Sequence, residues 1–269
     1  MDKEQKLIEE IVRAVRKCAQ IIVEAKRSDE MVDAKEGHAN FVTTYDKQVQ
    51  EELKKELLAI TPDAAFAGEE EESICIPKKG LTYIVDPIDG TTNFIYDYHM
   101  SCISVGVLMD YEPYMAVIYN PYLDEMYTAI AGRGAFMNGK SIHVSEGNFS
   151  SSLVAFGTAP YYEELKQESF RLAYEVLGRA ADVRRSGSAA LDFCAVAAGR
   201  VAMFFELRLC PWDFAAGALL VTEAGGVVTT VDGQPLDYSK KGSAIARGKG
   251  YEEEVNQLFM NKPDNIEVD

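Results

Sequence analysis

Apolar residues recur at three- and four-residue spacing in two stretches near the start of the chain, with charged residues between them. The first stretch covers residues 2–28 and the second covers residues 44–59. This spacing is typical of an amphipathic helix that buries one face. The sequence therefore predicts two helices, joined by a loop at residues 28–42 in which the hydrophobic pattern has little periodicity.

Short segments rich in β-branched and aromatic residues dominate residues 102–145, where Asp, Asn, Pro and Gly separate them. This pattern predicts an antiparallel meander. After it, strand-like and helix-like segments alternate. The expected strands are 152–158, 181–187, 201–207, 225–233 and 243–248, and the expected helices are 163–180, 188–200, 211–226 and 251–259.

The alternation of these elements indicates the class of fold. Because no repeat or flexible linker interrupts them, we expect one layered α+β unit over residues 1–269. Within it, two lobes, 1–180 and 181–269, are expected to meet near residue 180.

Composition narrows the class of function. The net charge of −16 leaves no basic stripe for a nucleic-acid backbone. The charged N-terminus and the absence of a long apolar run predict a cytoplasmic protein without a membrane segment. Five scattered cysteines read as reduced thiols, and three separated histidines give no imidazole metal site.

The stretch YIVDPIDGTTNF, residues 83–94, is the first candidate for chemistry. Its apolar start predicts a strand, and Asp86 should end that strand because Pro87 restricts the residue before it. Gly90 permits a tight turn, and Thr91 or Thr92 suits the N-cap of a following helix.

This arrangement has two interpretations. Asp86 and Asp89 on a turn beside a helix N-terminus would suit a Mg²⁺ ion and a phosphate. The alternative is an Asp-rich surface turn with a threonine cap, which is common in soluble proteins.

Additional acids would favour a cation site. Glu69, in the acidic run GEEEES, follows an apolar segment and would leave a strand end much as Asp86 does. Asp213, in CPWDFAAG, would lie in the first turn of a helix. Their alternatives are a solvated acidic loop and an acid favoured by the helix dipole. Spacing in the sequence does not by itself join these residues.

DPIDGTTNF together with PWDFAAGALLVTEAGG resembles the two signature motifs of the inositol monophosphatase family of Mg²⁺-dependent, lithium-sensitive phosphatases. The similarity extends to VTTYD at 42–46, GEE at 68–70, GSAALDFCAVAAGR at 187–200 and FFE at 204–206. The resemblance implies a layered α/β/α/β/α sandwich in a single catalytic domain, and a homodimer.

The resemblance also implies the metal ligands. Glu69, Asp86 and the backbone carbonyl of Ile88 would hold a first Mg²⁺. Asp86, Asp89 and Asp213 would hold a second, with Asp86 bridging the two. A third, weaker ion would sit near Glu69 with water molecules.

Catalytic roles follow from the same resemblance. Thr91, oriented by Asp46, would position and deprotonate the attacking water together with Glu69. Glu70 remains an alternative to Glu69, because neighbouring acids can trade places. Lys35, in the 28–42 loop, matches a lysine that approaches the metal site.

The substrate contacts that the resemblance implies are Asp89, Gly90, Thr91, Gly187, Ser188, Ala189 and Glu206. The N–H groups of Gly90 and Thr91 would bind the phosphate. Glu206 would accept hydrogen bonds from a neutral polyol and repel a second phosphate, unless it is an ordinary strand-end acid.

The sequence leaves the substrate open. The favoured substrate is inositol monophosphate, hydrolysed to inositol and phosphate by a metal-activated water with no covalent intermediate. Arg184, Arg185 and Arg208 are either exposed strand-edge charges or contacts for a second phosphate. The second reading leaves fructose-1,6-bisphosphate, 3′-phosphoadenosine 5′-phosphate or NADP as substrates. A non-enzymatic, metal-stabilised regulatory protein is a further alternative.

Aromatic residues near these segments have a simpler interpretation. Tyr161, Tyr162 and Trp212 are expected to pack in the core rather than to contact a ligand.

Overall fold

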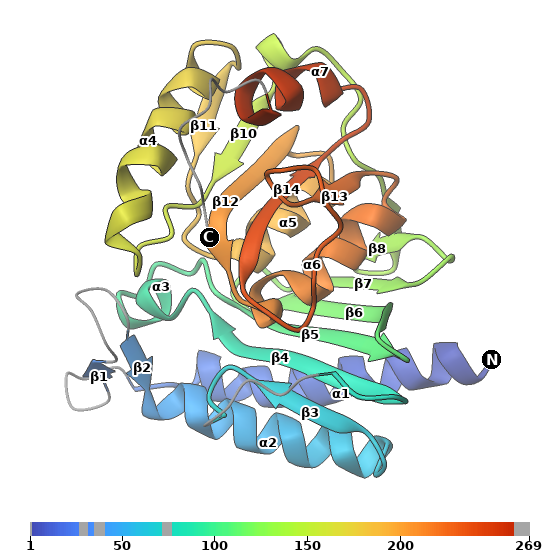
Figure 1. Ribbon diagram of the computed structural model, residues 1–269. Coiled ribbons are helices and arrows are strands. Elements are labelled where there is room, and N and C mark those ends of the chain that lie inside the picture. Colours follow the sequence, from blue (N-terminus) through green and yellow to red (C-terminus); the bar gives the residue numbers. More distant parts are fainter. Residues whose placement is uncertain (1, 27–31, 35–40, 72–76, 261–269) are drawn as a thin grey trace.

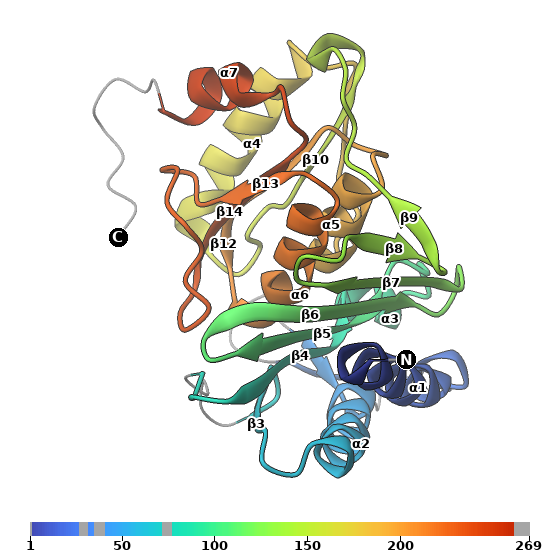
Figure 2. The same ribbon diagram turned by 90° about the vertical axis from the view of Figure 1, so that its right-hand side faces the viewer.

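The computed structural model describes residues 2–26, 32–34, 41–71 and 77–260. Two stacked β-sheets and three layers of helices alternate (Figures 1 and 2). This arrangement confirms the predicted α/β/α/β/α sandwich.

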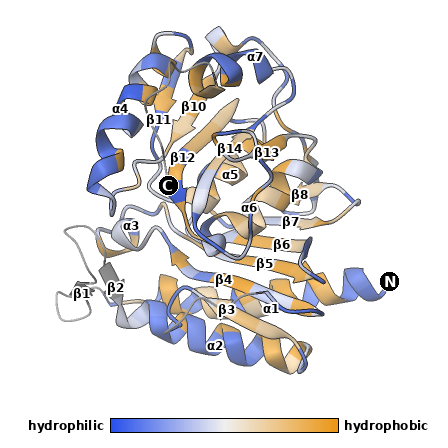
Figure 3. Cartoon of the chain, in the orientation of Figure 1, coloured by the Kyte–Doolittle hydropathy of each residue, from blue (hydrophilic) through white to orange (hydrophobic). Residues whose placement is uncertain are grey.

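Two helices, α1 (Lys3–Val23) and α2 (Thr44–Ile60), cover the outer face of the first sheet (Figure 1). Both were predicted from the spacing of their apolar residues. The buried stripe of α1 packs against that of α2 and against strands of the sheet. The solvent side of both helices is hydrophilic, as Figure 3 shows.

The predicted loop at 28–42 contains a small antiparallel pair, β1 (Val32–Ala34) with β2 (Phe41–Thr43). The prediction of an unstructured loop was therefore wrong for the five of these residues that lie in it, 32–34 and 41–42, because their backbones pair without the long apolar alternation that signals a strand. Lys35 lies outside the described residues.

The first sheet has seven strands in the order β3-β4-β5-β6-β7-β8-β9. β3 (Ala65–Gly68) runs parallel to β4 (Leu81–Asp89), and every later pairing is antiparallel. This confirms the predicted meander. Its strands are β5 (Cys102–Met109), β6 (Glu112–Asn120), β7 (Glu125–Ile130), β8 (Ala135–Met137) and β9 (Lys140–Ile142).

The second sheet has five strands in the order β11-β10-β12-β14-β13. They are β10 (Leu153–Phe156), β11 (Asp182–Arg184), β12 (Met203–Leu209), β13 (Val227–Thr229) and β14 (Gly242–Arg247). The chain passes from the first sheet to the second between residues 142 and 153.

Two helices, α5 (Ala189–Ala197) and α6 (Pro211–Glu223), fill the space between the sheets (Figure 2). They are apolar almost all round, as expected for helices covered on two faces. Helices α4 (Glu163–Leu177) and α7 (Glu252–Val255) cover the outer face of the second sheet. No helix in the described residues is long and apolar enough to cross a membrane.

Candidate active site

Strand β4 places two acids at the edge of the space between the sheets. Its pairing with β5 is regular up to Asp86 and irregular between Asp86 and Asp89. Pro87 has no N–H to donate, which explains the break. The prediction that Asp86 ends the strand was wrong, because pairing resumes at Asp89. Both carboxylates are buried.

A short helix, α3 (Thr91–Ile95), follows directly. Its N-cap is Gly90, with φ of 90°, so neither predicted threonine caps it. A Cβ at Gly90 would lie 2.8 Å from the Met100 carbonyl oxygen, so the turn requires glycine. The Thr91 hydroxyl is directed elsewhere, 3.1 Å from Asp46 Oδ1 and 3.1 Å from the Ile88 carbonyl oxygen.

Asp46 is held in place by the start of α2. The backbone N–H of Thr43 donates to its Oδ2 at 2.7 Å and the Thr43 hydroxyl at 2.5 Å, forming a capping box. Burial raises the pKa of Asp46, and the negative charge of Glu70 adds to this. The pairing of Thr91 with Asp46, which the family resemblance implied, is present in the structure.

Glu69 comes directly after β3, at the strand end where it was predicted. Its backbone N–H donates to the Val85 carbonyl at 3.1 Å, and its side chain lines the cavity described below. The backbone N–H of Glu70 donates to Gln50 Oε1 at 2.9 Å, and Glu70 is not among the lining residues. The structure therefore favours Glu69 over Glu70 as the residue of the site.

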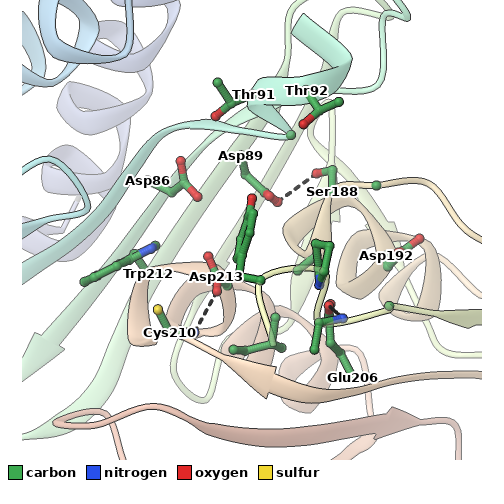
Figure 4. Close-up of a pocket in the computed structure, with 18 of the residues that line it drawn as sticks. Asp86, Asp89, Thr91, Thr92, Ser188, Asp192, Glu206, Cys210, Trp212 and Asp213 are labelled. Carbon is green, nitrogen blue, oxygen red and sulfur yellow. Dashed lines mark hydrogen bonds between the residues drawn. The ribbon is translucent and has the colours of Figure 1, made fainter. Parts of the chain in front are cut away.

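Asp213 lies in the first turn of α6, after Pro211. Its Oδ2 accepts from the backbone N–H of Cys210 at 2.7 Å. Figure 4 shows Asp86, Asp89 and Asp213 around one open space. The acid from the second motif is thus brought to the acids of the first, which spacing alone did not indicate.

These residues line a cavity of about 370 Å³ at the junction of the two sheets. Its lining includes most of the predicted site residues. They are Glu69, Asp86, Ile88, Asp89, Gly90, Thr91, Gly187, Ser188, Ala189, Glu206 and Asp213. Asp46 lies behind Thr91 and reaches the cavity only through it.

The carboxylates of this cavity repel one another. Burial raises the pKa of Asp86 well above its usual range, and the charges of Glu69, Asp89 and Asp213 raise it further. Burial and these neighbours also raise the pKa of Asp213. Among the residues that the structure describes, no Lys, Arg or His forms an ion pair with Asp86, Asp89 or Asp213.

Asp89 is anchored to the other half of the molecule. Its Oδ2 accepts from the Ser188 hydroxyl at 2.7 Å and from the Ala190 N–H at 2.6 Å, at the start of α5. Burial raises the pKa of Asp89 to about 6, although these hydrogen bonds act in the opposite direction. Ser188 thus positions Asp89, and the hydroxyl proton of Ser188 is donated to that carboxylate.

The donor set suits a hard divalent cation, because carboxylates and a backbone carbonyl are the ligands that Mg²⁺ prefers. A cation would also relieve the repulsion that raises the pKa values of these acids. In the described ranges, however, no three His, Cys, Asp or Glu side chains are close enough together to hold an ion as they stand. The acids share a cavity and must converge further to bind one.

The opposite end of the cavity has different chemistry. Glu206 lies against Gly157 and accepts from the Ala159 N–H at 2.9 Å. Burial raises the pKa of Glu206 to about 7. Figure 4 shows Glu206 on the far side of Asp213 from Asp86. A carboxylate here is placed to accept hydrogen bonds from an alcohol.

Several lining residues were not assigned to the site from sequence. Among them are Asn93, Asp192, Cys210 and Lys241. Asp192 stands on a helix that reads as apolar, and a buried acid in such a helix was an available signal. Lys241 stands in an ordinary SKKGS run, where no pattern separates it from Lys240.

The three arginines that were interpreted either as exposed strand-edge charges or as contacts for a second phosphate differ in their positions. Arg184 is exposed, pairs with Asp182 and does not line the cavity, as expected of a strand-edge charge. Arg185 and Arg208 line the cavity. Nothing in their sequence neighbourhood distinguishes these from Arg184.

The packing prediction for the aromatic residues was partly wrong. Trp212 and Tyr162 pack against buried clusters, although both also line the cavity. Tyr161 is 53% exposed, because the loop turns through Ala159, whose φ is 42°, and Pro160. Tyr161 nevertheless lines the cavity, and desolvation of its hydroxyl raises its pKa, as do the charges of Glu69 and Asp213.

Four cysteines in the described residues are free thiols, as predicted: Cys18, Cys102, Cys194 and Cys210. Cys75 lies outside the described residues.

Comparison with known proteins gives a consistent result. The profile of the "Inositol monophosphatase family" matches residues 3–263. The chain is 36% identical over 262 residues to "Inositol monophosphatase 2" of Solanum lycopersicum, covering 94% of this chain and 98% of the relative. It is 34% identical over 257 residues to "Nus factor SuhB" of Escherichia coli K12, covering 95% of each.

A comparison with solved structures finds the same kind of relative. The extragenic suppressor protein suhB from Bartonella henselae superposes with a TM-score of 0.87 at 30% identity, covering 96% of this chain and 100% of the other. The relatives therefore share the fold over nearly their whole length, but their names describe two different roles.

Proposed function

Because the chain belongs to the inositol monophosphatase family, a family of phosphoric monoester hydrolases, we propose that it hydrolyses inositol monophosphate to inositol and phosphate. The attacking group is water, and no covalent intermediate forms. One observation carries this proposal: acids from two distant motifs line the same cavity as Thr91, whose hydroxyl is hydrogen-bonded to Asp46. We further infer one catalytic domain, acting as a homodimer.

The proposed cofactor is Mg²⁺, with two or three ions in each site. Glu69, Asp86 and the carbonyl of Ile88 would hold one ion, and Asp86, Asp89 and Asp213 a second. Bound together, they would neutralise the phosphate, lower the pKa of water and stabilise the departing alkoxide.

Thr91 has a defined task in this scheme. When its hydroxyl donates to Asp46, the lone pairs of its oxygen are directed to a water molecule and accept that water's proton. Glu69 shares the proton. Asp46 is buried and held by Thr43, so it fixes the orientation of Thr91 and does not touch the substrate. Lys35, predicted to approach this site, stays a prediction.

Substrate binding is divided between the two ends of the cavity. The N–H groups of Gly90 and Thr91 are proposed to bind the phosphate. Glu206 and Asp89 accept hydrogen bonds from the hydroxyls of the polyol. The residues 187–189 form the side of the cavity between them. A ring with several hydroxyls, such as inositol, matches this set of acceptors.

A direct test is phosphate release from a panel of esters by the wild type and by Asp86→Asn. We expect release from inositol 1-phosphate only with Mg²⁺, inhibition by Li⁺, and a fall in kcat of about 10³-fold or more in the variant. Light scattering would report the dimer. No release from any ester would refute the catalytic proposal and favour the regulatory role that the SuhB name suggests.

A further inference from the structure

Asn93 connects the first motif to the opposite side of the cavity, and the proposed reaction gives this residue no task. It stands on α3 and lines the cavity. Its side-chain Nδ2 donates to the Met100 carbonyl oxygen at 2.7 Å and to the Ser186 carbonyl oxygen at 2.9 Å. Ser186 lies 93 residues further along the chain. Both protons of one amide are therefore committed, one to each carbonyl.

The Met100 carbonyl lies against the turn that is proposed to bind phosphate. A Cβ at Gly90 would lie 2.8 Å from this carbonyl oxygen and 3.4 Å from Asn93 Nδ2. The side chain of Asn93 is therefore packed against the phosphate-binding turn. Its bond to Ser186 carries this fixed position across to the second half of the chain.

The other carbonyl belongs to residues 185–188, which we call the substrate loop. Strand β11 ends directly before this loop, and α5 begins directly after it. The loop includes Gly187 and Ser188, which are proposed to contact the substrate. Because the loop itself is neither strand nor helix, its position depends on hydrogen bonds to its surroundings.

Side chains supply these hydrogen bonds. Arg185 Nε donates to the Thr158 hydroxyl oxygen at 3.2 Å, in the loop that follows β10. Ser186 Oγ accepts from the Ser188 N–H at 3.0 Å and donates to the Ser188 carbonyl oxygen at 2.9 Å. The bond from Asn93 ties the substrate loop to α3. The loop is therefore stiffened from within and attached on two sides.

Gly187 allows Asn93 to approach the substrate loop this closely. The φ of Gly187 is 85°, and a Cβ there would lie 3.0 Å from Asn93 Nδ2 and 3.2 Å from Asn93 Oδ1. The left-handed backbone and the lack of space both favour glycine. The side chain of Asn93 and the path of the substrate loop are therefore matched to each other.

We propose that Asn93 is a positioning residue for recognition of the alcohol. It holds the substrate loop at a set distance from the phosphate-binding turn, so that a polyol ring meets the loop while its phosphate lies at the turn. This inference rests on the proposed hydrolytic function and adds a residue to the recognition of its substrate. Asn93 does not contact the reacting atoms in this scheme and acts through the substrate loop.

The carboxylates should be little affected by a shift of the substrate loop. Asp89 accepts a hydrogen bond from the Ala190 N–H at 2.6 Å, and Ala190 lies within α5. Asp89 keeps this bond even where the bond from Ser188 is weakened. Loss of the Asn93 amide is therefore expected to weaken binding of the alcohol more than binding of phosphate or the rate of the reaction.

The variant Asn93→Leu removes both donors and keeps a side chain of similar size. One assay of inositol release gives kcat and KM for inositol 1-phosphate and the inhibition constant for inorganic phosphate. We expect KM to rise about tenfold, with kcat and the inhibition constant within about twofold of the wild type. An unchanged KM would overturn the inference, as would an equal rise of KM and of the inhibition constant.

Asn120→Ala is the matched control. Asn120 is buried, its Oδ1 accepts from the backbone N–H groups of Tyr122 and Leu123 at 2.9 and 3.2 Å, and it lies outside the cavity lining. We expect this variant to lose stability in urea unfolding and to keep all three constants. If it raised KM as much as Asn93→Leu does, the effect of Asn93 would reflect a general loosening, and the inference would fail.

Ser186→Ala tests whether the effect passes through the substrate loop. This variant removes the hydrogen bonds within the loop and keeps the carbonyl that Asn93 binds. We expect a selective rise of KM, and a combined effect with Asn93→Leu that is smaller than the product of the two single effects. A full product would contradict a shared loop. If Asn93→Leu does not fold, the Ser186→Ala constants decide alone, and an unchanged KM overturns the inference.

Binding separates this inference from the proposed function. Affinities for inositol 1-phosphate and for inorganic phosphate would be measured by calorimetry with Ca²⁺ replacing Mg²⁺. If no ester is hydrolysed but Asn93→Leu selectively weakens binding of inositol 1-phosphate, the proposed function fails and the role of Asn93 stands. If the wild type hydrolyses inositol 1-phosphate and Asn93→Leu changes neither KM nor this affinity, the inference fails and the function stands.

Discussion

The two ends of the cavity are built in opposite ways. At the carboxylate end, Asp86 and Asp89 stand on a buried strand, and backbone N–H groups fix Asp89 and Asp213. At the alcohol end, Arg208 and Lys241 are long side chains that are partly or fully exposed and rest on one tyrosine ring. One end is therefore rigid, and the other is able to adjust its side chains.

This difference separates the residues that are proposed to carry out the reaction from those that are proposed to select the substrate. Positioning a water and a phosphate tolerates errors of only a fraction of an ångström, which favours short side chains on a rigid backbone. Recognition of the alcohol needs charge and hydrogen-bonding groups at a larger radius, and flexible side chains can supply them. Substitutions at the first end should change kcat, and substitutions at the second should change which ester is used.

The largest effect is expected for Thr91→Val, which removes the hydroxyl and keeps the branched shape. We expect kcat to fall by about 10²–10⁴-fold, because the proposed proton acceptor of the attacking water is lost. Steady-state phosphate release measures this. Thr91→Ser should restore most of the rate, and a Thr91→Val enzyme with normal kcat would show that the hydroxyl has no catalytic role.

A smaller effect, of the other kind, is expected for Gly157→Ala. The added Cβ would lie 1.9 Å from Glu206 Oε2, so the carboxylate must move away. We expect KM for inositol 1-phosphate to rise about tenfold with less change in kcat, since only contacts to the alcohol are displaced. Gly147→Ala is the control, because its Cβ would meet only the Tyr251 hydroxyl, at 3.7 Å. Equal changes in kcat and in KM would contradict the assignment of catalysis to one end of the cavity and of substrate selection to the other.

The smallest effect concerns stability, measured for metal-free protein by urea unfolding between pH 4 and 8. Because the pKa of Glu206 is raised to about 7 from 4.5, the folded state binds more protons than the unfolded state between these values. Its contribution therefore becomes destabilising as pH rises through this window. Glu206→Gln should be more stable than the wild type at pH 8 by up to about 3 kcal/mol, and nearly equal to it at pH 4.

A stability difference that stayed constant over this pH range would contradict the raised pKa of Glu206. The variant keeps an oxygen for the Ala159 N–H, so loss of that hydrogen bond does not confuse the comparison.

Sequence reasoning succeeded where local pattern and motif coincide. The amphipathic α1 and the alternating strands from β5 to β9 have periodicities that follow directly from burial on one face. The acids Glu69 and Asp89 stand at strand ends and Asp213 in a first helical turn, where the backbone fixes their direction, and Asp86 stands at the irregularity within β4.

It failed where the decisive contact is between distant segments. Tyr161 was predicted to pack in the core, because nothing local shows that the loop after β10 turns back over the cavity. Lys241 differs from Lys240 only through the pairing of β12 with β14, which brings it beside Arg208. The cap of α3 was assigned to a threonine, because the hydrogen bond from the Thr91 hydroxyl to Asp46, which lies on another helix, cannot be predicted from the local sequence.

The anchoring of Asp89 to Ser188 and Ala190 joins a strand of the first sheet to the start of a helix that packs between the sheets. A carboxylate that is proposed to take part in the reaction therefore also connects two halves of the chain through hydrogen bonds. A mutation that removes this acid would at the same time remove the hydrogen bonds between the first sheet and α5. In a lineage of such proteins, the acid would then persist even in a member that had given up catalysis, so its presence alone does not certify an active enzyme.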